Sequence, residues 1–69
     1  MSQTETDTQS LKDAIKQANA RATASKLDLH DLAEDLPQGW EQIMATAERT
    51  YQAYRHLAEL KATLANQGG

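Results

Sequence analysis

The sequence predicts an all-α protein, an antiparallel two-helix hairpin of coiled-coil type that oligomerises into a four-helix bundle. Alanine and leucine dominate the apolar residues, and phenylalanine and valine are absent, which favours helices over strands. Two long stretches carry apolar residues at alternating spacings of three and four, the pattern of heptad seams. Between the two stretches lie the only proline, Pro37, and the only interior glycine, Gly39.

A chain of 69 residues makes at most one domain, and a fold of this size buries little surface. Small folds usually add disulfides, a metal or a partner chain. The absence of cysteine excludes a disulfide framework and a thiolate metal site. We therefore expect a homo-oligomer, either a dimer or a tetramer.

Charge and hydropathy restrict the partners and the compartment. The net charge of -3 argues against a nucleic-acid or anionic-membrane partner. No apolar run approaches the length that spans a bilayer. Residues 1–9 lack the basic and hydrophobic regions of a signal peptide. We therefore expect a cytoplasmic protein.

The first helix is predicted over residues 10–35. Residues 1–9 are polar after Met1, which predicts a disordered tail. Ser10 is the expected N-cap, with Asp13 near the positive end of the helix dipole. The heptad seam then runs through more than three heptads, and its centre is small. Its positions are Leu11, Ile15, Ala18, Ala22, Ser25, Leu29, Leu32 and Leu36.

The turn is predicted over residues 36–39 and the second helix over residues 40–66, with a frayed end at 67–69. Proline disfavours helical backbone in the residue before it, so the first helix ends near Leu36. A connection this short makes the helices antiparallel. The second seam is read as Trp40, Ile43, Ala47, Thr50, Tyr54 and Leu57. The strict repeat would then reach Lys61, and the apolar phase instead moves to Leu60 and Leu64.

A single hairpin leaves its seam half covered, so two hairpins packed face to face are expected. Residues 23–52 carry a net charge of -4, whereas residues 10–22 and 53–66 together carry +3. An antiparallel dimer places each acidic turn half beside a basic open half. The predicted oligomer core is Leu11, Ile15, Ala18, Ala22, Ser25, Leu29, Leu32, Leu36, Trp40, Ile43, Ala47, Tyr54 and Leu57.

Four residues at the end of the first helix fall outside its seam, and they are Leu27, His30, Asp31 and Glu34. They are predicted to form one outward-facing surface, here called the outer stripe. One interpretation is a partner-binding site. Another is a divalent metal site at His30, Asp31 and Glu34, completed by symmetry mates or water. The third is a solvated acidic face with a His–Glu contact.

The sequence lacks the motifs of an enzyme. It has no Gly-rich phosphate loop and no serine or cysteine nucleophile with a base at useful spacing. His56 and Glu59 reverse the order of the di-iron Glu-x-x-His motif, and the further inward glutamates are missing. Lys12, Lys16 and Arg21 have no aromatic residues between them, so they make a poor nucleic-acid surface.

The chain resembles the Rop-like family of small bacterial proteins associated with nitrogen-fixation gene clusters, over about residues 11–64. The similarity is strongest at Lys26-Leu27-Asp28-Leu29-His30-Asp31-Leu32-Ala33-Glu34-Asp35-Leu36-Pro37, and it continues through Trp40, Ile43 and Ala47-Glu48-Arg49-Thr50-Tyr51. Where the family pattern is expected to have methionine, this chain has Leu27. The resemblance implies an oligomerising helical hairpin in the cytoplasm of a nitrogen-fixing bacterium.

The resemblance leads to two functional hypotheses of different classes. The first is a non-catalytic accessory protein that docks onto nitrogenase or its assembly and maintenance machinery through the outer stripe. The second is a small protein that binds iron, nickel or zinc for nitrogen fixation through His30 and Glu34. An RNA-binding bundle is a third reading, which the acidic balance disfavours.

Overall fold

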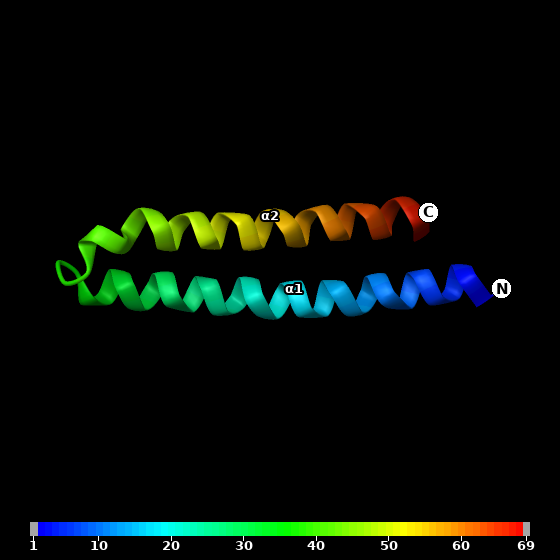
Figure 1. The fold of residues 1–69 in the computed structure, drawn as a ribbon, viewed down its shortest axis with the longest axis horizontal. Helices are drawn as coiled ribbons and strands as arrows, with labels where there is room; N and C mark the ends of the chain where they lie inside the picture. The colour runs from blue at the N-terminus through cyan, green and yellow to red at the C-terminus, as the bar shows by residue number, and fades with distance from the viewer. Residues whose placement is uncertain (1, 69) are drawn as a thin grey trace.

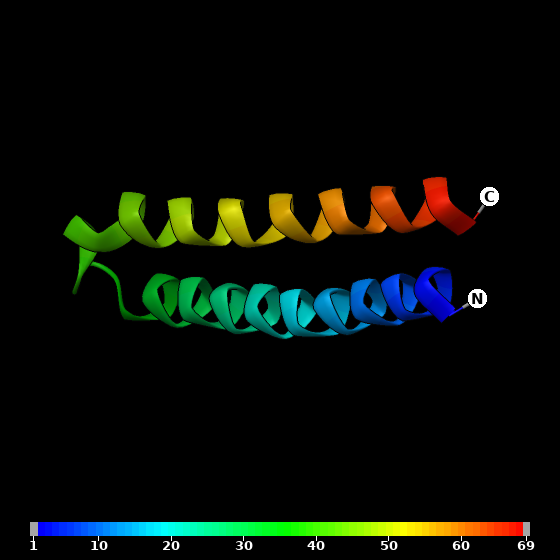
Figure 2. The same cartoon turned by 45° about the vertical axis from the view of Figure 1, so that its right-hand side comes forward.

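The protein is a single helical hairpin. The computed structural model describes residues 2–68, with side chains described over residues 8–67. Helix α1 spans Ser2–Asp35, a 3₁₀ helix η1 spans Trp40–Gln42, and helix α2 spans Ile43–Gly68. The two long helices lie side by side and antiparallel, so that the start of α1 and the end of α2 lie at the same end of the molecule (Figures 1 and 2). The predicted two-helix hairpin is therefore confirmed.

Both helices extend beyond their predicted bounds at the open end of the hairpin. Helix α1 begins at Ser2, so residues 2–9 are helical where the sequence predicts a disordered tail, and Ser10 lies inside the helix instead of capping it. Residues 2–9 contain no proline or glycine, and adding turns to an existing helix avoids the cost of nucleation. Helix α2 continues to Gly68. Met1 and Gly69, predicted to belong to the tail and the frayed end, lie outside the described residues.

The turn between the helices comprises residues 36–39 and begins with a cis peptide bond between Leu36 and Pro37. The Gln38 amide donates a hydrogen bond to the Asp35 carbonyl at 2.9 Å, which closes the end of α1. Gly39 has φ 76°, a left-handed conformation that residues with a Cβ rarely adopt. A Cβ at this position would also lie 3.1 Å from Leu32 Cδ1. The tight reversal therefore requires glycine.

The core of the hairpin is thin and is built from small residues on α1. Ala18, Ala22 and Leu57 form the buried cluster, and Ile15, Ala53 and Leu60 pack against it. Alanine on α1 opposite alanine and leucine on α2 allows the helix axes to approach closely. The first seven predicted seam positions of α1, from Leu11 to Leu32, are buried or half-buried in the single chain.

The α2 residues that face α1 differ from the predicted seam. The sequence reading placed Ala47 and Tyr54 in the seam, but Thr46 and Ala53 take these two positions. Thr46 is buried and Ala53 is half-buried. Ala47 is half-buried at the edge of the seam. The intrachain seam of α2 comprises Thr46, Thr50, Ala53, Leu57, Leu60 and Leu64. This seam keeps a strict heptad spacing to its end, so the predicted change of phase at Lys61 does not occur. Thr46 and Ala53 are small enough to lie between two closely packed helices, whereas the sequence reading placed the bulky Tyr54 in the seam.

Four residues of the predicted oligomer core remain exposed in the single hairpin. Their exposed fractions are 41% for Leu36, 62% for Trp40, 37% for Ile43 and 38% for Tyr54. The pairing of α1 with α2 therefore does not cover them. Their burial between chains stays a prediction, because it concerns a second hairpin.

A threonine hydroxyl joins the two helices within the seam. Thr50 Oγ1 donates toward the Ser25 carbonyl of α1 at 3.2 Å and toward the Thr46 carbonyl of its own helix at 2.9 Å. The small Ser25 side chain lets the α1 backbone come within reach. Thr46 Oγ1 in turn accepts a contact from Arg49 Nη2 at 3.4 Å. These contacts give hydrogen-bond partners to polar groups that lie in the narrow seam, away from water.

Candidate functional site

The outer stripe lies on the last turns of α1, close to the turn. Leu27, His30 and Glu34 follow one another at spacings of three and four, so their side chains share one side of the helix. All four members, including Asp31, are exposed. Leu27 is 54% exposed although it is a large apolar residue. The stripe therefore combines an uncovered leucine with two carboxylates and an imidazole, and the packing of the hairpin uses none of them.

His30 and Glu34 form the one charged contact inside the outer stripe. His30 Nε2 lies 3.7 Å from Glu34 Oε2, and both side chains are mostly in solvent. This contact is an ion pair only while the imidazole is protonated, and at a solvated helix surface such pairs contribute a few tenths of a kcal/mol at most, about 0.3–0.5. The pair therefore adds little to stability and leaves both groups accessible to a ligand or a partner.

The outer stripe of one chain does not assemble a complete metal site. Within residues 8–67, no group of three or more His, Cys, Asp or Glu side chains converges to hold an ion. Asp31 follows His30 directly, so its side chain projects about 100° around the helix from it. The predicted site at His30, Asp31 and Glu34 thus has at most two convergent ligands from one chain. It stays a prediction that depends on ligands from water or a second chain.

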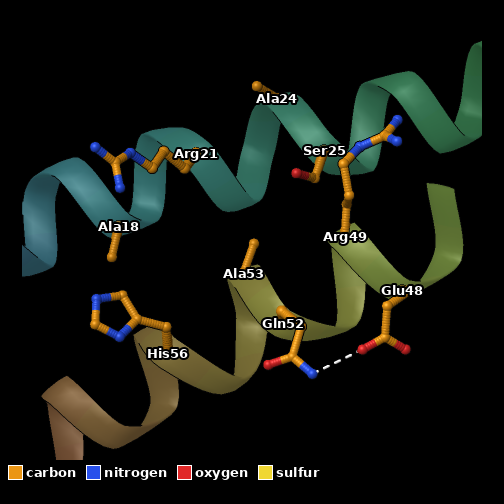
Figure 3. A pocket seen from close by; sticks show the side chains of 9 residues that line it. All are labelled: Ala18, Arg21, Ala24, Ser25, Glu48, Arg49, Gln52, Ala53 and His56. Carbon is orange, nitrogen blue, oxygen red and sulfur yellow. Dashed lines mark hydrogen bonds between the residues drawn. The ribbon is translucent and has the colours of Figure 1, made fainter. Parts of the chain in front are cut away.

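A second feature, an open groove between the two helices, was missed by the sequence reading. Arg21 and Ala18 line it from α1, and His56 and Ala53 line it from α2 (Figure 3). Its remaining lining residues are Ala24, Ser25, Glu48, Arg49 and Gln52. Gln52 donates a hydrogen bond to Glu48 Oε2 at 2.8 Å along the rim. The four small residues of the lining, which leave the space between the helices unfilled, are the sequence signal that could have revealed the groove.

The groove contains a hydroxyl and an imidazole but no nucleophile–base pair. Ser25 and His56 both line it, yet within residues 8–67 no hydrogen bond joins their side chains. A nucleophilic serine needs a base within hydrogen-bond reach. The groove has a mostly apolar floor and two guanidinium groups, from Arg21 and Arg49. These are features of a contact surface.

A third feature lies on the side of α2 that does not face α1. Trp40, Met44, Tyr51 and Tyr54 belong to the large apolar side chains that the hairpin leaves exposed. They fall on a second strict heptad, here called the α2 stripe, which comprises Trp40, Met44, Ala47, Tyr51, Tyr54, Ala58, Lys61 and Ala65. The sequence reading divided these residues between a core seam and its flanks, because it placed Ala47 and Tyr54 in the intrachain seam.

Neither helix could cross a membrane: within the described residues, no stretch is both long enough and apolar enough.

Comparison with known families matches most of the chain to one of them. The sequence pattern of the family described as Rop-like matches residues 6–68. The "UPF0437 protein in nifX-nifW intergenic region" of Frankia alni is 47% identical over 55 residues, which cover 80% of this chain and 67% of that protein. A "UPF0437 protein" of Trichormus variabilis is 52% identical over 54 residues, which cover 78% of this chain and 63% of that protein. The chain thus spans about two thirds of the length of these relatives.

A solved structure shares the hairpin. It is an NMR structure of a Northeast Structural Genomics Consortium target, with 55% sequence identity and a TM-score of 0.82. The match covers 87% of this chain and 84% of the other. The two-helix arrangement is therefore found in a protein of closely related sequence.

Proposed function

The chain belongs to the Rop-like family, and from this premise we propose that it is a non-catalytic accessory protein of nitrogen fixation. In this role it docks onto a nitrogenase component, or onto the machinery that assembles or maintains nitrogenase. One relative is named for a place between nifX and nifW, which supports the pathway. The family match indicates no catalytic family, and the groove holds no hydrogen-bonded nucleophile and base. The exposed outer stripe supports a binding role.

The observation that carries the docking role is the composition of the outer stripe. Leu27 is exposed beside Asp31, Glu34 and His30, and the hairpin needs none of the four for its own packing. In a docked complex, burial of the Leu27 side chain would supply affinity and the neighbouring charges would supply specificity. We assign the partner contact to this stripe.

The docking protein acts as a cytoplasmic homo-oligomer in this proposal. Over residues 8–67, the buried hydrophobic cluster has three residues, Ala18, Ala22 and Leu57. Such a small cluster supplies little stability on its own. A four-helix bundle formed with a second hairpin would enlarge the core and would carry two copies of the outer stripe.

A pull-down from nitrogen-fixing cells tests the docking role. Tagged wild-type protein should capture a nitrogenase component or an assembly protein, which is then purified and titrated with the untagged chain. The double variant Asp31→Lys/Glu34→Lys should lose this binding, because charge reversal on the stripe replaces attraction with repulsion.

The matched control for this test is Asp13→Lys/Glu59→Lys, which reverses the same number of exposed charges away from the outer stripe. It should bind like the wild type. Equal binding by the stripe variant and the wild type would show that the outer stripe is not the interface, and failure to capture any nitrogen-fixation protein would contradict the docking role itself.

A second candidate function is the binding of iron, nickel or zinc for nitrogen fixation. It is favoured by the distance of 3.7 Å between His30 Nε2 and Glu34 Oε2. Two ligands from one helix bind a divalent ion weakly unless further ligands join them. Calorimetry on tag-free protein with each metal is the measurement. Binding no tighter than about millimolar, or binding unchanged by His30→Ala, would exclude this candidate.

A further inference from the structure

The open groove between α1 and α2 has the size and the lining of a small-molecule site. Its open volume is about 600 Å³, within the range of sites that hold small ligands. Ala18, Ala24 and Ala53 contribute apolar surface, and Ser25 adds a hydroxyl. The lining shares no residue with the outer stripe or with the α2 stripe. The groove is therefore a separate feature, which the docking role leaves unused.

Two arginines border this apolar surface, and neither is paired with a carboxylate. Arg21 lines the groove from α1 and Arg49 lines it from α2. Over residues 8–67, both ion pairs lie outside the groove. Glu48, the carboxylate of the lining, accepts a hydrogen bond from Gln52 at 2.8 Å. The chain has 10 acidic residues and 7 lysines and arginines, so two unpaired guanidinium groups beside one groove are unusual for its charge balance.

We propose that the groove binds a small organic carboxylate with an apolar body, such as a medium-chain fatty acid. The carboxylate accepts two parallel hydrogen bonds from the Arg21 guanidinium group, a geometry in which the two groups match. The hydrocarbon body lies along the alanines, where its burial supplies affinity. This ligand site goes beyond the proposed function, because it involves none of the residues assigned to docking.

The arrangement of the cationic side chains favours Arg21 as the partner of the carboxylate. Arg21 and His56 lie at the same end of the groove, near Ala18 (Figure 3). The imidazole of His56 provides a second N–H donor at this end. Arg49 extends from α2 toward α1 at the other end (Figure 3), and its Nη2 atom already contacts the Thr46 hydroxyl at 3.4 Å.

The length of the groove limits the size of the ligand. Ala18 and Ser25 both line it from α1, and their separation along the helix is about 10 Å at a rise of about 1.5 Å per residue. An extended chain of about eight carbons has a similar length, given C–C bonds of about 1.5 Å. Arg49 crosses the groove beyond this distance (Figure 3). An octanoate ion therefore fits between the two arginines.

The site is tested by NMR titration of the full chain, labelled with nitrogen-15, with three probes. Octanoate carries both the charge and the apolar body, octanamide carries the body without the charge, and acetate carries the charge with almost no body. We expect octanoate to shift amide signals within residues 18–25 and 48–56, with a Kd below about 1 mM. Octanamide and acetate should each bind at least about tenfold more weakly.

The variant Arg21→Gln should raise the Kd of octanoate by about tenfold or more, because it removes the charged donors. The matched control is Lys16→Gln, which removes one positive charge from the same helix at an exposed position outside the lining, and its Kd should stay within about twofold of the wild type. Arg49→Gln should have a smaller effect than Arg21→Gln. Circular dichroism of each variant verifies that the hairpin is intact, since all three side chains are exposed.

The outcomes that would overturn the ligand site differ from those that would overturn the docking role. Shifts that do not saturate, or that map to the outer stripe or the α2 stripe, would overturn the site. Equal binding of octanoate and octanamide, or an unchanged Kd in Arg21→Gln, would overturn the assignment of a carboxylate ligand. A larger effect of Arg49→Gln would overturn the placement of the carboxylate at Arg21. Capture of a nitrogen-fixation protein through the outer stripe is unaffected by any of these results.

Discussion

In the half of α2 near the turn, the two sides of the helix differ in the size of their side chains, although both follow a strict heptad. The intrachain seam has Thr46, Thr50 and Ala53 opposite α1, whereas the α2 stripe has Trp40, Tyr51 and Tyr54 facing solvent. Small residues allow close helix approach but bury little area, while aromatic residues bury much area but need a receiving surface. In this half of α2 the hairpin covers small side chains with α1 and leaves large ones exposed, whereas toward the open end the seam itself becomes large, with Leu57, Leu60 and Leu64.

The largest expected effect comes from shortening the one large buried residue of the seam. Leu57→Ala should lower the free energy of unfolding by about 2–4 kcal/mol, because it removes buried methyl groups and leaves a cavity against Ala18 and Ala22. Urea denaturation followed by circular dichroism measures the change at several protein concentrations.

The substitution Tyr51→Ala on the α2 stripe is the counterpart of Leu57→Ala in the intrachain seam. It should destabilise the protein only at concentrations at which dimers form, because Tyr51 does not belong to the intrachain core. A loss of stability at high dilution equal to that of Leu57→Ala would contradict the division of α2 into two functionally different sides.

A smaller effect is expected at the turn, which sets the register of the seam. Gly39→Ala should cost about 1–2 kcal/mol, because alanine disfavours φ 76° and its Cβ would meet Leu32 Cδ1 at 3.1 Å. Thermal unfolding is the measurement, with Gln38→Ala in the same turn as the control. A melting temperature for Gly39→Ala equal to that of Gln38→Ala would show that the left-handed conformation is not required.

The smallest effect is expected for the hydrogen bond between the helices. Thr50→Val keeps the shape of the side chain but removes the hydroxyl that reaches the Ser25 carbonyl at 3.2 Å, and should cost about 1 kcal/mol. Native-state hydrogen exchange measures the resulting loss of protection along the seam. Thr63→Val is the matched control, because the Thr63 hydroxyl contacts only its own helix, at the Glu59 carbonyl. An equal loss of protection in both variants would show that the hydrogen bond between the helices adds nothing to stability.

Much of the fold could be predicted because local chemistry dictates it. Pro37 and Gly39 locate the reversal, and their neighbours carry the helical periodicity on either side. The outer stripe was also predictable, since residues off the seam of a long helix must face outward. The extra turns of α1 before Ser10 were not, because polar residues such as those at 2–9 read equally well as tail or helix when no apolar periodicity is present.

The sequence by itself determined that two heptad helices reverse at Pro37–Gly39, because backbone restrictions and periodicity are local properties. Only the tertiary structure decided which of two overlapping heptads on α2 faces α1. Both heptads satisfy the helical period, and the choice depends on the space that Ala18, Ala22 and Ser25 leave across the seam. That space admits Thr46 and Ala53 and leaves Tyr54, together with Trp40, exposed on the neighbouring side of α2.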